Sequence, residues 1–297
     1  MNGIININKS INMTSHDVVN IIRRKLKIKK VGHTGTLDPI AEGVLPICIG
    51  NATKISQFII EKDKEYIAEA VLGIKTDTFD RTGKVLKTNN SIPKENEISN
   101  ALNQYVGDVL QTPPIYSAIK VSGKKLYEYA RENIQVDIKP REVKIYDIEL
   151  LEYSYPKLKI KVACSKGTYI RSLCNDIGEV LGSFAHMNSL VRTKSGSFTI
   201  ENTVNLNKFE DMNALEIQNI MYPIDYPLDH FKKVDIKESS TKYLLNGNIL
   251  FQKNITQNLD LFHENEIVKL YSQNNFKGLG KILCEDYQKI KPLRIIK

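Results

Sequence analysis

Residues 31–50 read Val31-Gly-His-Thr-Gly-Thr-Leu-Asp-Pro-Ile-Ala-Glu-Gly-Val-Leu-Pro-Ile-Cys-Ile-Gly50, and the rest of the sequence is best interpreted outward from them. The glycines of this stretch let the backbone bend tightly or approach a bound partner closely. Pro39 restricts Asp38 to an extended conformation, which places its carboxylate at the edge of a turn. The apolar run from Val44 to Ile49 predicts a buried strand. A short acid on a loop before a core strand is a common way to present a catalytic group, although an isolated Asp-Pro more often only starts a turn.

The whole string resembles the central motif of the bacterial tRNA pseudouridine-55 synthases, the TruB family. The match runs Gly-His-Thr-Gly-Thr-Leu-Asp-Pro-x-Ala-x-Gly-Val-Leu-Pro and continues into Gly50-Asn-Ala-Thr-Lys54. The resemblance implies that the chain isomerises a uridine to pseudouridine in the T-arm of tRNA, at position 55 of the TΨC loop, by flipping the base and without a cofactor. The motif's aspartate, which is the nucleophile of the family, falls on Asp38.

The resemblance also implies two further catalytic residues. Arg171, in Gly-Thr-Tyr-Ile-Arg, corresponds to the cation that pairs with the nucleophile, and a carboxylate that must stay ionised away from water needs such a partner. Tyr66 corresponds to the tyrosine that stacks on the target base and serves in removing the C5 proton. Read alone, Arg171 is an ordinary arginine at a helix start and Tyr66 is a core tyrosine. Attack at C6, attack at C1′ and a glycal route all stay open.

Three more positions are implied as substrate contacts beside Tyr66. Tyr169 would line the uracil pocket, and Leu190 would form its apolar wall. His33 matches the family residue that fills the space left by the extruded nucleotide, although a lone loop histidine is more often only a loop residue.

Basic residues suggest where the RNA backbone would bind. Arg23 to Lys30 holds six basic residues in eight, which fits either phosphate contacts or a solvated helix end. A segment at about 111–142 interleaves basic groups with tyrosines and is similar to the family's RNA-clamping insertion, while a plain surface helix is the alternative. Lys9 belongs to Lys9–Ser15, which keeps part of the family's opening Lys-Pro-x-Gly-x-Thr-Ser but lacks its Pro and Gly. The residues expected to contact the RNA backbone are Lys9, Arg23, Arg24, Lys124, Lys125 and Arg131.

Composition sets broad limits on the class of protein. The 297 residues carry 42 Lys and Arg against 34 Asp and Glu, and this excess of 8 positive charges suits a polyanionic partner or simply solubility. The four cysteines show no paired spacing, and the five scattered histidines show no metal-ligand pattern, so we expect no metal. We find no signal peptide and no apolar run of about 20 residues, so we expect no membrane partner and a cytoplasmic address.

Local patterns predict the elements. We expect a first strand over 3–7, and a helix capped by Ser15 that uses Val18, Val19, Ile22 and Leu26. Tyr66, Ala68, Ala70 and Leu72 share one face of a strand over 66–73. We expect a helix over 93–106 and a strand over 158–162 that leads to a helix around residues 173–181. We also expect short C-terminal strands around 248–251, 267–271 and 280–284, with a turn at Asn246-Gly247.

The resulting fold class is α+β, the pseudouridine synthase fold: a central mixed, largely antiparallel sheet and a small C-terminal β-rich, PUA-like domain. We expect a catalytic domain over 1–230 and an RNA-binding domain over 231–297. A non-catalytic RNA binder on this scaffold would need neither Asp38, Tyr66 nor Arg171. A subunit that acts with guide RNA would need partner proteins, whereas the insertion suits a stand-alone enzyme with no obligatory protein partner.

Overall fold

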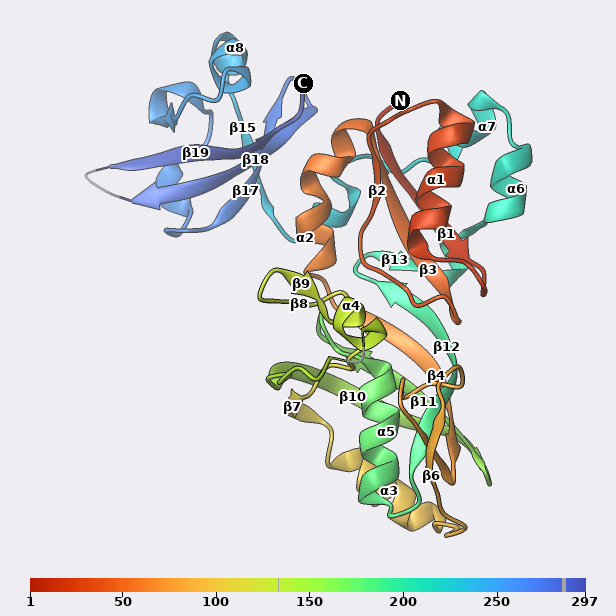
Figure 1. Ribbon diagram of the computed structural model, residues 1–297. Coiled ribbons are helices and arrows are strands. Elements are labelled where there is room, and N and C mark those ends of the chain that lie inside the picture. The colour runs from red at the N-terminus through yellow and green to blue at the C-terminus, as the bar shows by residue number, and fades with distance from the viewer. Residues whose placement is uncertain (133, 285–286) are drawn as a thin grey trace.

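The computed structural model describes residues 1–132, 134–284 and 287–297, which form one large mixed sheet and one smaller sheet (Figure 1). The large sheet lies within residues 3–205, and the first strand of the small sheet begins at Lys232. Residue 133 of the expected insertion and residues 285–286 of the expected C-terminal domain lie outside the described residues.

The large sheet is mixed and largely antiparallel, as the sequence predicts. Its strand order is β14-β1-β3-β12-β4-β11-β10-β7, with β2 beside β3 and β13 beside β12. Among the pairings of described residues, β1 with β14 and β3 with β12 are parallel and the other pairings in this sheet are antiparallel. The strands are β1 (Gly3–Lys9), β2 (Val31–His33), β3 (Ala41–Ile49), β4 (Lys64–Leu72), β7 (Gly107–Gln111), β10 (Arg141–Ser154), β11 (Lys157–Cys164), β12 (Ala185–Ser195), β13 (Phe198–Thr199) and β14 (Val204–Asn205). A separate hairpin joins β5 (Ile74–Thr76) to β6 (Val85–Thr88).

Eight α-helices are present among the described residues. They are α1 (Ser15–Leu26), α2 (Ser56–Ile60), α3 (Glu95–Asn103), α4 (Leu126–Arg131), α5 (Ile170–Val180), α6 (Leu206–Asp211), α7 (Ala214–Asn219) and α8 (Thr241–Leu245). Short 3-10 helices are η1 (Gly50–Ile55), η2 (Ile200–Asn202), η3 (Tyr226–Leu228), η4 (Glu238–Ser240), η5 (Gln252–Asn254) and η6 (Leu259–Leu261). The helix expected over 93–106 is α3, which is shorter at both ends than the apolar pattern alone suggests.

The expected cap of α1 is wrong by one residue. Thr14 caps the helix, because its hydroxyl accepts from the amide of Asp17 while the Asp17 carboxylate accepts from the amide of Thr14. Ser15 is the first helical residue, and its hydroxyl is used by the loop that carries Asp38, described below.

Alternation along the strands divides the core between the two faces of the large sheet. Leu45 and Ile47 of β3 pack into a cluster that also holds the apolar faces of α1, α3, α5, α6 and α7. Val44 and Cys48 of the same strand point into a second cluster with η1, α2 and the C-terminal domain. On β4, Tyr66, Ala68, Ala70 and Leu72 are buried on one face, as predicted.

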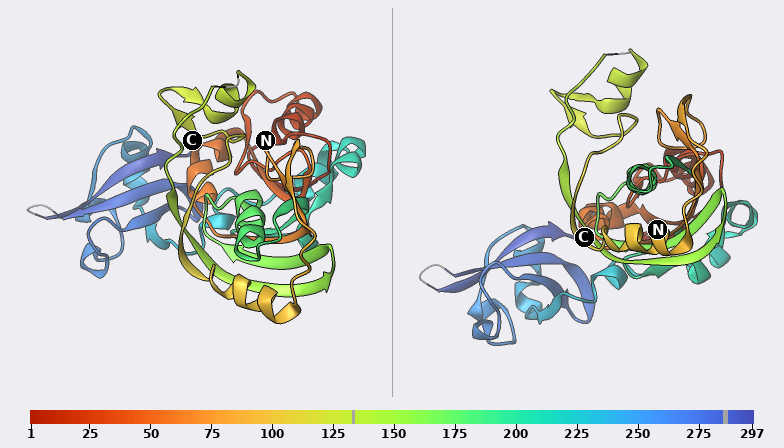
Figure 2. Two further views of the ribbon diagram at one scale, coloured as in Figure 1. Left: turned by 60° about the horizontal axis from the view of Figure 1, so that its bottom comes forward. Right: turned by 90° about the horizontal axis from the view of Figure 1, so that it is seen from below.

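The segment expected as an insertion leaves the sheet at β7 and returns at β10. It contains the two-residue strands β8 (Lys120–Val121) and β9 (Lys124–Lys125), followed by α4. Figure 2 shows it in yellow-green, standing away from the sheet and from the C-terminal domain. Within it, Leu126 and Ala130 of α4 are buried.

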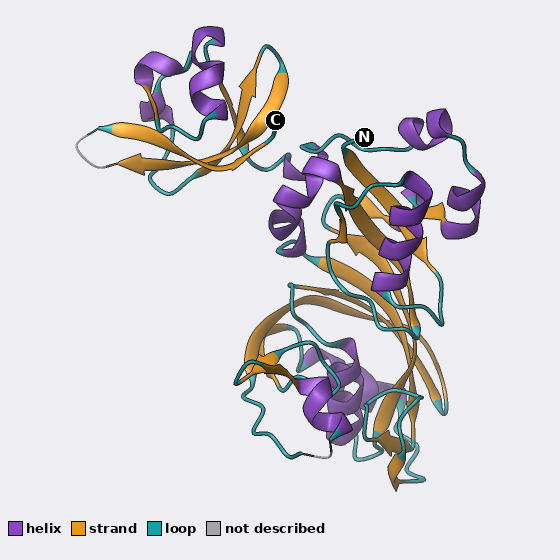
Figure 3. Cartoon of the chain, turned by 45° about the horizontal axis from the view of Figure 1, so that its top comes forward, coloured by secondary structure: helices purple, strands orange, loops and turns teal. Residues whose placement is uncertain are grey.

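The C-terminal residues form a separate five-stranded sheet in the order β15-β17-β18-β19-β16 (Figure 3). Its strands are β15 (Lys232–Asp235), β16 (Leu250–Phe251), β17 (Ile267–Ser272), β18 (Asn275–Cys284) and β19 (Gln288–Ile295). The three predicted strands correspond to β16, β17 and β18, while β15 and β19 are too rich in charged residues to show a clear alternation. The predicted turn at Asn246-Gly247 is present and ends α8, with Gly247 at a positive φ of 83°.

The small domain is fastened to the large sheet rather than tethered by a loose linker. Leu279 and Ile296 pack into the second cluster beside Ile4. Lys54 donates to the carbonyl of Ile295 at 2.7 Å, which ties η1 to the end of the last strand. In the part of the chain that the structure describes, no helix has the length and apolar character needed to cross a membrane.

Candidate active site

The loop that carries Asp38 joins β2 to β3 and is held by neighbours on both sides. The Thr34 amide donates to the carbonyl of Pro46 at 3.1 Å. The Ser15 hydroxyl accepts from the Leu37 amide at 2.8 Å and donates to the Leu37 carbonyl at 3.2 Å. The backbone immediately before Asp38 is therefore fixed by buried bonds to α1 and β3.

Arg171, the second residue of α5, meets the Asp38 carboxylate with two nitrogens. Its Nε lies 2.9 Å from Oδ2 of Asp38, and its Nη2 donates to Oδ1 at 3.2 Å. The arginine side chain is 6% exposed, whereas that of Asp38 is 34% exposed. A planar guanidinium matches a carboxylate edge in this way and fixes its orientation. The carboxylate thus has a cation behind it and an open side toward solvent.

Asp80 is a second carboxylate on the same guanidinium, and the sequence analysis missed it. Its Oδ2 lies 3.6 Å from Nη1 of Arg171. Its Oδ1 accepts from the hydroxyls of Thr78 and Thr82, at 2.8 and 2.6 Å. The buried arginine therefore lies between a partly exposed acid, Asp38, and a buried one, Asp80. The available signal was Thr76-Asp-Thr-Phe-Asp-Arg-Thr-Gly83, whose hydroxyl and carboxyl spacing is typical of a self-bonded turn but does not identify a partner 91 residues away.

Arg192 is the second residue that the sequence analysis missed, and it is 1% exposed. It lies directly opposite Tyr66 in the β4–β12 pairing. Its Nε donates to the carbonyl of Val44 at 2.7 Å and its Nη2 to that of Gly35 at 3.1 Å, so it links β12 to the loop that carries Asp38. Gly43 is required here, because its φ is +104° and a Cβ would meet the Arg192 carbonyl oxygen at 2.3 Å.

Burial and charge act on Tyr66 in opposite directions. The residue is 9% exposed, and burial raises the pKa of its phenol, while the guanidinium of Arg192 favours the phenolate. Burial prevails, so the phenol pKa lies above its ordinary value. The same burial lowers the pKa of the Arg192 guanidinium.

The remaining expected substrate contacts lie on elements that border Asp38. Leu190 is buried on β12, opposite Ala41 of β3 and Ala68 of β4. Tyr169 is the N-cap of α5, two residues before Arg171, and burial raises the pKa of its phenol. His33 ends β2, where its Nδ1 accepts from the Gly35 amide at 3.3 Å. Burial lowers the pKa of His33, and the positive charge of Arg192 acts in the same direction, so the imidazole favours its neutral form.

The expected phosphate contact at Lys9 is wrong. Lys9 is completely buried at the end of β1, and its Nζ donates to the carbonyls of Ser10 at 2.9 Å and Met13 at 2.8 Å. Burial lowers the pKa of this ammonium to about 8. The side chain thus closes the turn after β1, where the family motif has Pro and Gly, and an enclosed ammonium is not available to a phosphate.

The other residues expected to contact the RNA backbone divide into two groups. On α1, Arg24 is exposed, whereas Arg23 is partly buried and its Nη2 donates to the carbonyl of Val31 at 2.8 Å. The other group, in the insertion, pairs cations with rings: Lys124 lies over Tyr129, and Lys125 and Arg131 lie over Tyr127. Lys124 also pairs with Glu132. Their role with RNA stays a prediction.

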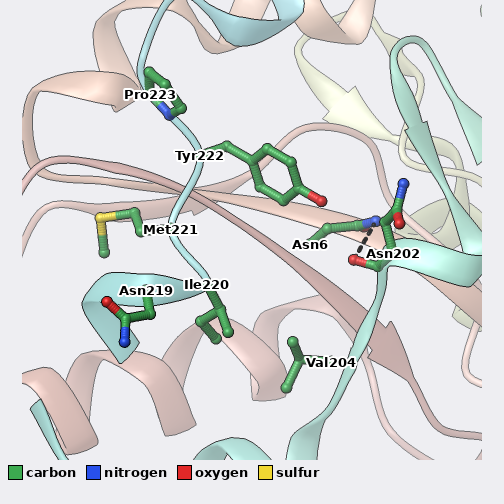
Figure 4. A pocket seen from close by; sticks show the side chains of 8 residues that line it. All are labelled: Asn6, Asn202, Val204, Asn219, Ile220, Met221, Tyr222 and Pro223. Atoms are coloured by element: carbon green, nitrogen blue, oxygen red, sulfur yellow. Dashed lines mark hydrogen bonds between the residues drawn. The ribbon is translucent and has the colours of Figure 1, made fainter. Parts of the chain in front are cut away.

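One cavity of about 300 Å³ lies away from this site, where β1 meets residues 219–223 (Figure 4). Asn6 and Asn202 lie on one side of it, and the Asn6 amide donates to the carbonyl of Thr199 at 2.9 Å. Neither Asp38 nor Arg171 lines it, so it plays no part in the arrangement described above. Among the described residues, no group of three or more His, Cys, Asp or Glu side chains is placed to hold a metal ion.

Two family models match consecutive parts of this chain. Residues 23–170 match the family model of the TruB family pseudouridylate synthase (N terminal domain), and residues 171–229 match that of the tRNA pseudouridylate synthase B C-terminal domain. A tRNA pseudouridine synthase B of Alkaliphilus oremlandii is 46% identical over 301 residues, covering 100% of this chain and 99% of the relative. The tRNA pseudouridine synthase B of Clostridium tetani is 47% identical over 294 residues, covering 99% of this chain and 100% of the relative.

Solved structures show the same fold. A structure of an H/ACA RNP bound to a substrate RNA containing 2′-deoxyuridine matches with a TM-score of 0.75 at 26% identity, covering 99% of this chain and 85% of that one. The archaeal box H/ACA sRNP Nop10-Cbf5 complex matches with the same values. With the full-length relatives and the two family models, these matches show that this chain belongs to the TruB family of pseudouridylate synthases.

Proposed function

We propose that this protein isomerises a uridine of tRNA to pseudouridine and that Asp38 is its nucleophile. The observation that carries the proposal is the Asp38–Arg171 pair, in which a buried guanidinium holds a carboxylate whose other side is open. A protein that only bound RNA would need no carboxylate fixed in this way. Names of full-length relatives, which are tRNA pseudouridine synthases B, support the substrate class.

The reaction is a rearrangement within one nucleoside. The bond between N1 and C1′ breaks, a bond between C5 and C1′ forms, C5 loses a proton and N1 gains one. No atom enters or leaves overall, so the reaction requires no redox partner, and we propose no cofactor. A nucleophile that holds the sugar or the base while the uracil turns is the main chemical requirement.

The site supplies the nucleophile in an oriented form. Because Arg171 is itself bound by the Thr78 carbonyl at 3.3 Å and by the Tyr116 carbonyl at 3.0 Å, it can hold Asp38 in one direction. A fixed reactive group avoids much of the entropic cost of reaching the reactive geometry. Attack at C6, attack at C1′ and a glycal route are all compatible with this placement.

We assign the neighbouring side chains to the flipped base. Tyr66 would stack on the uracil and Leu190 would cover its apolar edge, while Tyr169 closes the pocket from the start of α5. His33 would fill the space from which the nucleotide leaves. Base flipping is needed because the reacting atoms of a stacked nucleotide are out of reach. To accept the C5 proton, Tyr66 would first have to lose its own phenolic proton, and the nearby positive charge of Arg192 would stabilise the phenolate.

We further propose the T-arm stem-loop of tRNA, with uridine 55 as the target, as the RNA that these elements bind. Arg24 on α1 and the cation–ring pairs of the insertion would contact phosphates and bases. The PUA-like domain over 231–297 would add a second RNA surface beside the catalytic domain over 1–230. The expected location is the cytoplasm, where tRNA is modified, and the protein would act there without an obligatory protein partner.

The test is nucleoside chromatography of an unmodified tRNA transcript after incubation with the purified protein alone. Wild type should convert one uridine, and a transcript with cytidine at position 55 should yield no pseudouridine. Asp38→Asn should reduce product by at least about a thousandfold while RNA affinity stays within about threefold of wild type. The matched control is Asp229→Asn, an exposed aspartate in the segment before the C-terminal domain, which should leave turnover unchanged.

Other results would overturn parts of this proposal. Turnover retained by Asp38→Asn would exclude Asp38 as the nucleophile. Tight binding without product from wild type would favour a binder or a guide-dependent subunit, and addition of guide RNA and cell extract would separate those two. Product at a site outside the T-arm would refute the assigned substrate region.

A further inference from the structure

The beginning of the insertion and the start of α5 are joined at several points. The side chain of Gln111, at the end of β7, pairs with the backbone of Tyr169: its Nε2 donates to the carbonyl at 3.0 Å and its Oε1 accepts from the amide at 2.7 Å. One residue later, the Thr112 carbonyl accepts from the Ser172 hydroxyl at 2.9 Å. The Tyr116 carbonyl accepts from Nη2 of Arg171 at 3.0 Å.

The side chain of Gln111 reaches from the insertion to the backbone at the start of α5, whereas those of Arg171 and Ser172 reach from α5 to the backbone of the insertion. Gln111 is 2% exposed, so its amide has no access to water as a substitute partner. The Gln111 side chain accepts from the Tyr169 amide and shares the Tyr169 carbonyl with the Leu173 amide, which donates to the same oxygen at 3.1 Å. Alanine or an apolar residue here would leave a buried N–H without an acceptor, which is costly in a dry environment.

We propose that Gln111 is a positioning residue for the isomerisation, because it ties the first residues of the insertion to the segment that orients Arg171 against Asp38. This inference rests on the proposed function and adds a residue to it. Through Gln111, a displacement of the insertion when RNA binds is transmitted to the helix start that carries the guanidinium. Gln111 touches none of the reacting atoms, so its effect is on the orientation of Asp38 and not on affinity.

The decisive variant is Gln111→Glu, because its side chain changes from acceptor to donor with pH. As a carboxylate, it can still accept from the Tyr169 amide but repels the Tyr169 carbonyl. When protonated, its hydroxyl donates to that carbonyl as the glutamine does, and burial favours this neutral form. Gln111→Met has a similar length and lacks both functions at every pH. Gln104→Glu, at the exposed C-cap position after α3, is the matched control.

Single-turnover rates are measured with saturating enzyme and an unmodified tRNA transcript between pH 5.5 and 8. At pH 8, Gln111→Glu should be slower than wild type by about tenfold to a hundredfold, and the ratio should recover to within about threefold at pH 5.5. Gln111→Met should show a similar loss at all pH values, and Gln104→Glu should follow wild type. RNA affinity should change by less than about threefold in each variant.

A Gln111→Glu rate equal to wild type at pH 8, or a loss that does not depend on pH, would overturn the proposal. Hydrogen–deuterium exchange over residues 169–173 provides a readout that does not need turnover. Exchange there should be faster in both Gln111 variants at pH 8 and return toward wild type only in Gln111→Glu at pH 5.5; unchanged exchange would refute the structural tie. If wild type formed no pseudouridine, the proposed function would fail while this exchange result still decided whether Gln111 holds the helix start.

Discussion

The loop that carries Asp38 and the insertion over 111–142 differ in how they are held. The loop is bonded on both sides, by Ser15 of α1 and by Arg192 of β12, whose guanidinium donates to the Gly35 carbonyl. The insertion is bonded to the catalytic core at its base, through Gln111 and Tyr116, and its outer part is organised by internal contacts such as that of Tyr129 with the Val121 carbonyl. The first arrangement suits chemistry that needs fixed atoms, and the second suits capture of a large, variable surface.

The largest effect should follow from removing the cation that both regions share. Arg171→Met deletes the partner of Asp38 and leaves Asp80 buried without its cation. We expect the single-turnover rate to fall by about a hundredfold to a thousandfold and the free energy of unfolding by about 3 kcal/mol. Nucleoside chromatography of samples quenched at successive times measures the rate, and urea unfolding measures the stability.

Arg171→Lys is the matched control, because it keeps the charge and loses the planar fork. It should recover most of the stability and only part of the rate. An Arg171→Met variant with wild-type rates would show that the reactivity of Asp38 does not depend on the ion pair. It would also remove the contrast between a fixed Asp38 loop and an adaptable insertion.

A smaller effect should follow from releasing the loop on its other side. Arg192→Met leaves the carbonyls of Val44 and Gly35 without their donor, which should lower the free energy of unfolding by about 1–3 kcal/mol, measured by urea unfolding. The rate should fall by about tenfold, because the loop and Tyr66 lose a common support. A variant more stable than wild type would mean that burying the guanidinium costs more than its two hydrogen bonds return.

The smallest effect should come from the insertion itself. Replacing both Lys124 and Lys125 by Ala should weaken tRNA binding by about threefold to tenfold and reduce the dependence of log affinity on log salt by about 1 to 2. Filter binding at several salt concentrations measures both, and the rate at saturating enzyme should be unchanged. Lys208→Ala, an exposed lysine on α6, is the control. A lower saturating rate with unchanged affinity would contradict the division between capture and chemistry.

Prediction from the sequence succeeded where the signal was local. The alternation of Tyr66, Ala68, Ala70 and Leu72 located β4, because a strand with one buried face repeats every two residues. The continuous apolar run after Gly43 located β3, because that strand is buried on both faces. The resemblance brought Asp38 and Arg171 together, and the structure places them in contact. Strands β15 and β19 were missed, since their charged residues interrupt the alternation of apolar and polar side chains that predicts a strand.

The errors arose where a residue's partner lies far away in the sequence or where local chemistry has two solutions. Lysine is usually a surface residue, but Lys9 is buried. Its ammonium can be buried because two carbonyls of the turn that follows it accept its hydrogen bonds. Thr14 and Ser15 are both acceptable helix caps, and Ser15 is taken by the Asp38 loop, 22 residues away.

The sequence by itself determined the family resemblance, the mixed sheet with its β-rich C-terminal part and the identity of the exposed carboxylate. Only the tertiary structure decided that Asp80 shares Arg171, that Arg192 pairs with Tyr66 across β12 and β4, and that Gln111 holds the backbone of Tyr169. The physical reason is that propensity and periodicity act between neighbours along the chain. A buried charge or amide, in contrast, is satisfied by whatever groups the packed sheet brings within about 3 Å, however distant in sequence.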